Sequence, residues 1–240
     1  MSNRLLPFRQ YDENDVINLF ANAASDTNPT TNGNGSAGVF VSVSAGNFSK
    51  DAITYVDRTE LGASYDHTKN QYPEVGLKVA AAAVGAKAGE VIGVTLKQTL
   101  EQDENGEKLL YNPVKRDELQ AVLSGQAVPL ATRGVFTLTS DAVEGAFPST
   151  APTPGQACVM SPVNAGKVSG IAFDSLVGDY NAAIANFAPT GTNFDLGGGN
   201  FVYYTYANVL GTWLGTGTRS SVGPVTDVAA GGYAVVKLNL

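Results

Sequence analysis

Hydrophobic and polar residues alternate over much of this chain with a period of two, which is typical of β-strands. The first clear run is VFVSVSAG (39–46), and from residue 75 onward similar short runs are bounded by Gly, Pro or Asn. The strongest are EVGLKVAAAAVG, GEVIGVTLKQTLEQ, SGQAVPLATRGVFTLTS, TPGQACVMSPVNAGKVSG, NFVYYTYANVLGTWLGTGT and GGYAVVKLNL. The pattern predicts a mainly-β protein without the strand–helix alternation of α/β folds.

Two local signals interrupt the strand pattern. Asn105-Gly106 is a dipeptide that favours the tight turn of a β-hairpin. The segment KRDELQAVL (115–123) has the composition of a short helix. Residues 50–76 predict only short strands and loops.

The opening segment NRLLPFRQYDENDVINLFANAAS (3–25) has a different pattern. Its apolar run Leu5–Phe8 is too short for an export signal and contains Pro7, which excludes a helix there. Asp12 can cap a helix, and the residues that follow at helical spacing are Val16, Leu19, Phe20 and Ala23. We therefore expect a short helix near 12–24. Such a helix must pack against the body of the chain or against a neighbouring molecule, and for Leu5–Phe8 a neighbour is favoured.

The chain divides into two parts by composition. Residues 1–38 are expected to form an N-terminal arm, the short helix and a flexible connector, DTNPTTNGNGSAG (26–38), made of turn-forming and small polar residues. Residues 39–240 are expected to form one β-rich domain with a long insertion near 174–200.

Charge is distributed unevenly along the 240 residues. Lys and Arg number 15 and Asp and Glu 22, giving a net charge of −7, and only ten of these residues lie in 121–240. The acidic balance argues against a nucleic-acid-binding surface, and no stretch is apolar enough to suggest a membrane span. The charge-poor half is either covered by other subunits or is a β surface solvated by Thr, Ser and Asn.

Little in the sequence suggests catalysis, and we expect no enzymatic activity and no cofactor or metal. The one cysteine, Cys158, lies in an alternating run and is expected to be buried. The one histidine, His67, lies in a polar loop without a second ligand nearby. VNAGKVSG (163–170) lacks the first glycine and the Ser or Thr of a phosphate-binding loop, so it predicts a turn. DENGEKL (103–109) lacks the spacing of a calcium loop and predicts a hairpin tip.

Several segments resemble the capsid decoration (cement) proteins of tailed bacteriophages. They are VPLATRGVFTLT (128–139), PGQACVMSPVNAGKVSG (154–170), VLGTWLGTGT (209–218) and GGYAVVKLNL (231–240). The steps Gly134-Val135-Phe136 and Pro154-Gly155-Gln156-Ala157 fit that family directly. The opening RLLPFRQYDENDVINLFA (4–21) resembles the start of virion structural proteins from cyanophage-like viruses. The N-terminal half is longer than in minimal decoration proteins, and YNAAIANFAPTGTNFDLGGGN (180–200) is an insertion.

The resemblance implies a compact β-barrel of the tulip type, usually a homotrimer, on the outer surface of a phage head assembled in the host cytoplasm. It implies that the major capsid protein is the partner and that the protein bridges capsid subunits. It further implies an N-terminal arm that contacts the capsid. The expected contact residues are Arg4, Leu5, Leu6, Phe8, Arg9 and Tyr11.

Three other functions fit the same composition. A tail or other low-copy virion protein would share the β-rich sequence. A carbohydrate-binding module is suggested by Tyr203, Tyr204, Tyr206 and Trp213, although such aromatics more often pack in a barrel wall. A β-barrel hydrolase would need two acidic residues of divergent pKa in a cleft.

Overall fold

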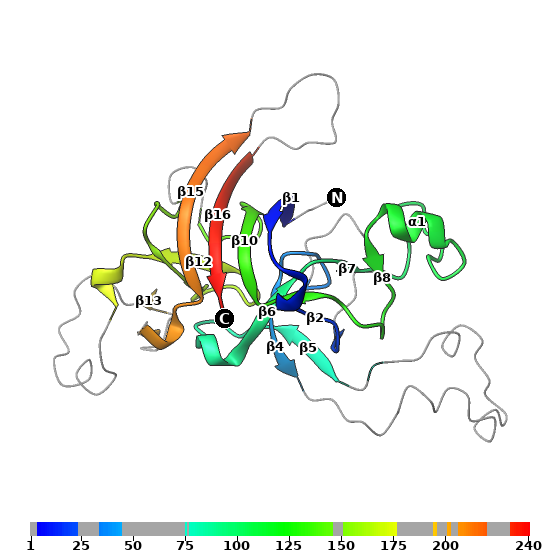
Figure 1. Ribbon diagram of the computed structural model, residues 1–240, viewed down its shortest axis with the longest axis horizontal. Coiled ribbons are helices and arrows are strands. Elements are labelled where there is room, and N and C mark those ends of the chain that lie inside the picture. The colour runs from blue at the N-terminus through cyan, green and yellow to red at the C-terminus, as the bar shows by residue number, and fades with distance from the viewer. Residues whose placement is uncertain are drawn as a thin grey trace.

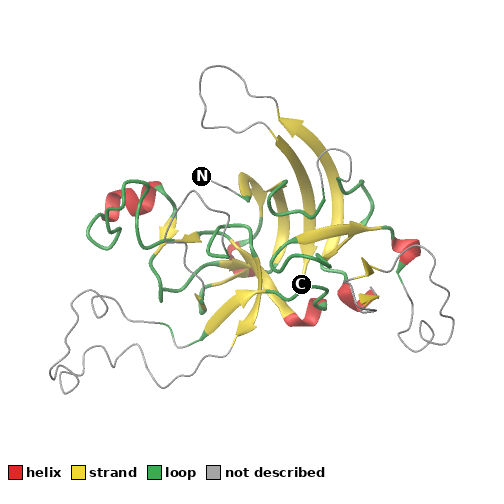
Figure 2. Cartoon of the chain, turned by 180° about the vertical axis from the view of Figure 1, so that it is seen from behind, coloured by secondary structure: helices red, strands yellow, loops and turns green. Residues whose placement is uncertain are grey.

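The structure is a computed structural model of the full chain. The residues it describes are 4–23, 34–44, 75, 77–145, 151–176, 194–195, 201–202, 206–219 and 231–240. Twelve of their sixteen strands belong to two six-stranded sheets, which Figures 1 and 2 show from opposite sides.

The first sheet, called sheet A here, is antiparallel throughout. Its strands, in spatial order, are β1 (Leu5–Gln10), β10 (Arg133–Thr139), β16 (Gly231–Asn239), β15 (Gly211–Arg219), β11 (Ala157–Met160) and β12 (Val168–Ile171). Strands β15 and β16 form a long curved hairpin (Figure 1). One residue, Leu214, is bulged between Trp213 and Gly215, and such bulges bend a strand.

The second sheet, sheet B, is built from shorter strands. In spatial order they are β2 (Val16–Ile17), β9 (Leu130–Ala131), β6 (Val91–Thr95), β4 (Phe40–Ser44), β5 (Lys78–Ala81) and β3 (Ala21–Asn22). All pairs are antiparallel except β3 with β5. A separate antiparallel pair of short strands, β13 (Phe194–Asp195) and β14 (Phe201–Val202), belongs to neither sheet.

Side-chain alternation places one face of sheet A in the core. In β16 the even-numbered residues Ala234, Val236 and Leu238 are fully buried, whereas their odd-numbered neighbours are half-buried or exposed. The main core joins this face to sheet B, and its largest side chains are Trp213, Phe136 and Phe40. The indole N–H of Trp213 donates to the Ser169 carbonyl at 3.2 Å, which satisfies its only polar group. We call the opposite side of sheet A its outer face.

A small lobe between β6 and β9 has its own apolar cluster. It contains β7 (Gln98–Thr99), α1 (Pro113–Glu118) and β8 (Ala121–Val122), and Figure 1 shows it projecting from the sheets. Its cluster is formed by Leu100, Leu109, Ala121 and Leu123.

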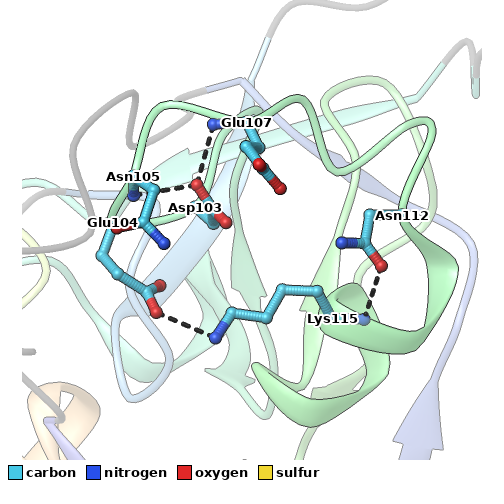
Figure 3. A network of polar contacts seen from close by, with 6 residues as sticks. All are labelled: Asp103, Glu104, Asn105, Glu107, Asn112 and Lys115. Carbon is cyan, nitrogen blue, oxygen red and sulfur yellow. Dashed lines mark hydrogen bonds and ion pairs between the residues drawn. The ribbon is translucent and has the colours of Figure 1, made fainter.

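The polar part of the lobe is shown in Figure 3. The Asp103 carboxylate accepts hydrogen bonds from the backbone N–H groups of Asn105 and Glu107, at 2.9 and 2.8 Å. Gly106 has a φ of +83°, as a tight turn requires. An ion pair of 2.8 Å joins Lys115 of α1 to Glu104, so the helix is tied to the turn.

The mainly-β prediction is confirmed, but the described strands form curled sheets and a half-barrel rather than a closed barrel. The strand at 39–46, the turn at Asn105-Gly106 and the turn within 163–170 are confirmed. The helix expected near 115–123 is present in part as α1, which begins two residues earlier and ends at Glu118, whereas Ala121–Val122 forms strand β8.

The prediction of a helix near 12–24 is wrong. Asp12 does act as a cap, but only of a single 3-10 turn, Glu13–Asp15. Val16–Ile17 then pairs with β9, and Ala21–Asn22 pairs with β5. Pairing with distant strands overrides the helical spacing, and β-branched Val16 and Ile17 favour an extended backbone.

The connector and the insertion lie partly outside the described residues. Of 26–38, only 34–38 are described, and they pack near β6, where the Gly38 N–H donates to the Thr95 carbonyl at 2.7 Å. Of 174–200, the described residues are 174–176 and 194–195, and 174–175 belong to a 3-10 turn, Phe173–Ser175. His67 lies outside the described part of the chain.

Candidate interaction surface

Strand β1 lies at one edge of sheet A and carries most of the residues predicted to contact a capsid. Its register with β10 is irregular, because Leu5 pairs with Leu138 and Arg9 with Phe136. Two extra residues are therefore bulged out of β1 beside Pro7. Proline has no backbone N–H to donate, so an edge strand with a bulge is where it is tolerated.

The alternating side chains of β1 line two different grooves. Leu5, Pro7 and Arg9 line one groove of about 440 Å³ that is shared with α1 and β7. Leu6 and Phe8 line a second groove of about 420 Å³. The other residues of this second groove are Thr137, Thr218 and Tyr233. The edge strand thus forms a wall between two hollows on opposite sides of it.

The structure separates the six predicted contact residues into two groups. Arg4, Leu5 and Leu6 are buried in the body of the protein, with exposed fractions of 4, 3 and 7%. Phe8 is 75% exposed, the largest exposed fraction among the large hydrophobic residues described.

The remaining two predicted residues, Arg9 and Tyr11, are less exposed than Phe8. Arg9 is half-buried and donates a long hydrogen bond (3.5 Å) to the Leu96 carbonyl. The ring of Tyr11 stacks on Phe136. Phe8 is therefore the most accessible of the six side chains, and the segment is anchored on both sides of it.

Sequence reasoning missed the residues that β10 and β16 bring to this edge. The hydroxyphenyl ring of Tyr233 lies over Gly217 of β15, where an added Cβ would come within 2.6 Å of the ring. Next to it, Thr137 faces the same groove and is only 6% exposed. The odd-numbered positions of GGYAVVKLNL were a usable signal, because a half-buried strand shows one face to its surroundings.

Over strands β11 and β12, the outer face of sheet A is covered by other apolar side chains. Ala157, Val159 and Ile171 pack there with Leu176 and Val209 in a separate apolar cluster. Between β1 and β15, by contrast, Val135, Tyr233 and Val235 remain half-buried. The uncovered part of this face is therefore next to Phe8.

The candidate reactive groups have structural roles in the described residues. Cys158 is fully buried in the main core, and burial raises the pKa of its thiol, so the nucleophilic thiolate is disfavoured. Among the residues that the structure describes, no cluster of His, Cys, Asp and Glu could hold a metal ion. No described helix has the length and apolar character needed to cross a bilayer.

The turn within 163–170 is held by side chains rather than shaped for phosphate. Ser161 is fully buried and donates to the Glu144 carboxylate at 2.7 Å, while its hydroxyl oxygen accepts from the backbone N–H groups of Val163 and Asn164. The Asn164 amide donates to the same carboxylate at 2.9 Å. These bonds occupy backbone N–H groups that a phosphate would need.

The aromatic residues proposed for sugar stacking do not gather on one exposed surface. Trp213 is fully buried in the main core, whereas Tyr206 is 60% exposed in the 3-10 turn Tyr206–Asn208. Tyr203 and Tyr204 lie outside the described residues. The packing role expected for aromatics of this segment is confirmed for Trp213.

Comparison with known proteins adds no relative: no family model, no curated protein and no solved structure matches this chain.

Proposed function

We propose that this protein is a structural virion protein, a capsid decoration or cement protein that binds the outer surface of a phage head and bridges capsid subunits. The proposal starts from the resemblance of 128–139, 154–170, 209–218 and 231–240 to such proteins. In the structure these segments supply five of the six strands of sheet A. The proposed partner is the major capsid protein, and the proposed assembly is a homotrimer with a tulip-type barrel.

The observation that best supports an interaction role is the exposure of Phe8. Exposing a phenylalanine to water is unfavourable by about 2 kcal/mol relative to burying it, so a surface Phe at a groove is a natural anchor for a partner. It is held in place by buried neighbours in sequence, Leu5 and Leu6, so little conformational entropy is lost on binding.

The proposed contact surface is part of the folded protein and is not a free N-terminal arm. Because Leu5 and Leu6 are buried and β1 pairs with β10, the strand binds as part of a preformed surface. Each copy can bind weakly, since a trimer presents three such surfaces and gains affinity from their high effective concentration.

The test is to mix the purified protein with undecorated, expanded heads and to count bound copies by cryo-electron microscopy. Deleting residues 1–25 is unsuitable, because it would remove strands from both sheets. The variant Phe8→Ser changes only an exposed side chain, and Tyr111→Ser, at a 62% exposed position in the lobe, is the matched control.

We expect dense, regular occupancy for the wild type and for Tyr111→Ser, with lower occupancy for Phe8→Ser. Copy number separates the proposal from its alternative, a tail or other low-copy virion protein. A regular lattice of bound copies supports decoration, whereas a few copies at one vertex support the alternative. A protein that sediments as a monomer and leaves heads bare contradicts both the trimer and the decoration role.

A further inference from the structure

The strands of sheet A carry only positive charges. Their four charged residues are Arg9, Arg133, Arg219 and Lys237. The chain as a whole has a net charge of −7, so this sheet is opposite in sign to the rest of the molecule. Arg9 lines the groove shared with α1, whereas Arg133 and Lys237 are exposed on the outer face. Cations exposed on an acidic protein favour contact with a negatively charged partner.

Arg133 and Lys237 lie next to each other on the outer face. Arg133 pairs with Asn239 and Val135 pairs with Lys237, so the two cations are diagonal neighbours about 7 Å apart at Cβ. Both side chains are exposed. The ion pairs between described residues are Lys115–Glu104 and Arg116–Asp117, so neither cation has a counter-ion in the described part of the chain.

The cation pair and the Phe8 groove lie on the same face of β10. Arg133, Val135 and Thr137 alternate toward the outer face, and Thr137 lines the groove. Four residues of β-strand place Thr137 about 13 Å from Arg133. The face therefore consists of a hollow beside Phe8, a half-buried strip at Val135 and Val235, and two cations at the far end.

We propose that this face binds an extended, carboxylate-bearing protein segment. Its carboxylates lie between Arg133 and Lys237, and an apolar side chain about 13 Å away enters the groove beside Phe8. A second copy placed by two-fold symmetry would bring like charges together, so a different acidic surface is favoured. Two cations are too few to bind nucleic acid tightly at physiological salt.

This inference deepens the proposed function, because the identity of the partner rests on that function. The test of the inference does not require phage heads. The probe is a synthetic peptide of Ser and Thr that carries one Leu and, four and six residues further on, two Asp residues, which an extended backbone places on the same face as the Leu. A second peptide has Asn in place of both Asp residues. Each is titrated to millimolar concentration into isotopically labelled protein at low salt, and amide chemical shifts are recorded.

We expect the Asp peptide to shift the amides of β10 and β16 near Arg133, Val135 and Lys237, and the Asn peptide to shift them far less. The variant Arg133→Gln/Lys237→Gln should bind the Asp peptide about ten-fold more weakly. The control Lys97→Gln/Lys108→Gln removes two exposed cations from the lobe and should bind like the wild type.

Three results would overturn the inference: equal shifts with both peptides, equal weakening by the two double variants, or no shift at all. Stronger binding of single-stranded DNA to the same amides would also overturn it in favour of a nucleic-acid site. The outcome is independent of the proposed function. Bare heads together with a positive peptide test would reject the capsid role and keep the acidic-segment site.

Discussion

The ring of Tyr11 stacks on the ring of Phe136, with centroids 5.9 Å apart and planes inclined by 16°. Phe136 is fully buried in the main core, and it belongs to β10, the strand that pairs with β1. The contact therefore fastens the chain just beyond β1 to the sheet. It closes over Gly134, where an added Cβ would come within 2.8 Å of Tyr11 Cβ.

We predict that Tyr11→Ala lowers the free energy of unfolding by about 1–2 kcal/mol, because ring burial and stacking are both lost. Tyr11→Phe keeps the ring and should remain close to wild type. Urea denaturation followed by Trp213 fluorescence measures both. Wild-type stability in Tyr11→Ala would mean that the segment does not dock on Phe136 in solution.

Two glycines of β15 provide a matched pair. A Cβ at Gly211 would collide with the backbone carbonyl of Lys237, whereas a Cβ at Gly215 would meet nothing within 4 Å. Gly211→Ala should therefore cost about 2–3 kcal/mol, because backbone of a paired strand must move. Gly215→Ala should change stability by less than about 1 kcal/mol. Thermal unfolding of the two variants measures the difference, and equal melting temperatures would contradict the strand pairing described here.

The residue after α1 adopts a left-handed conformation. Gln120 has a φ of +49°, and no other non-glycine residue in the described part of the chain has a positive φ. Glycine is favoured at this position after a helix, so Gln120→Gly should stabilise the protein by about 0.5–1 kcal/mol. Gln120→Ala keeps the unfavourable φ and should give no gain. Chemical denaturation of both variants tests this, and a stability gain in Gln120→Ala alone would point to the side chain instead.

The ion pair of the lobe predicts a small, acid-sensitive contribution to stability. The hydrogen bond from Lys115 lowers the pKa of Glu104 below its ordinary value, and the hydrogen bond to Glu104 raises the pKa of Lys115. Stability due to Glu104 is therefore present above its unfolded-state pKa and is lost as the pH falls through the lower folded-state pKa.

The variant Glu104→Gln should be less stable than wild type at neutral pH and equal to it well below pH 4. Added salt should reduce the neutral-pH difference, because both side chains are partly exposed. Glu107→Gln removes the same charge from the same turn without breaking an ion pair, so it should show a smaller effect. Denaturation curves of the three proteins at neutral pH and well below pH 4 measure these differences. A stability difference between Glu104→Gln and wild type that persists in acid would exclude the ion pair as its cause.

Sequence periodicity was sufficient to predict the strands that have one face buried and the other face at least partly exposed. In β16, alternation between Ala234, Val236 and Leu238 and their outward neighbours is visible in the residue types themselves. The Asn105-Gly106 turn was equally predictable, since its residues suit a positive φ at Gly106.

Periodicity failed where pairing with distant strands decides the conformation. Val16, Leu19 and Phe20 have helical spacing, yet Val16 pairs with Ala131 of β9. The two grooves beside β1 were also beyond sequence reasoning, because their walls come from β10, β15, β16 and α1. The exposure of the predicted contact residues also depends on long-range strand pairing. Leu5, for example, is buried because β1 pairs with β10, which lies far along the chain.

The strand order of sheet A has a consequence for biosynthesis. Strand β16 is the last in chain order, but it lies between β10 and β15. The sheet therefore stays incomplete on the ribosome until residues 231–239 have emerged, whereas the strands of sheet B lie before residue 132 and can pair earlier. Folding of this sheet is expected to be slow, because its pairings join strands far apart in the chain. Products of translation interrupted before residue 231 would leave the edges of β10 and β15 unpaired, and we expect them to aggregate.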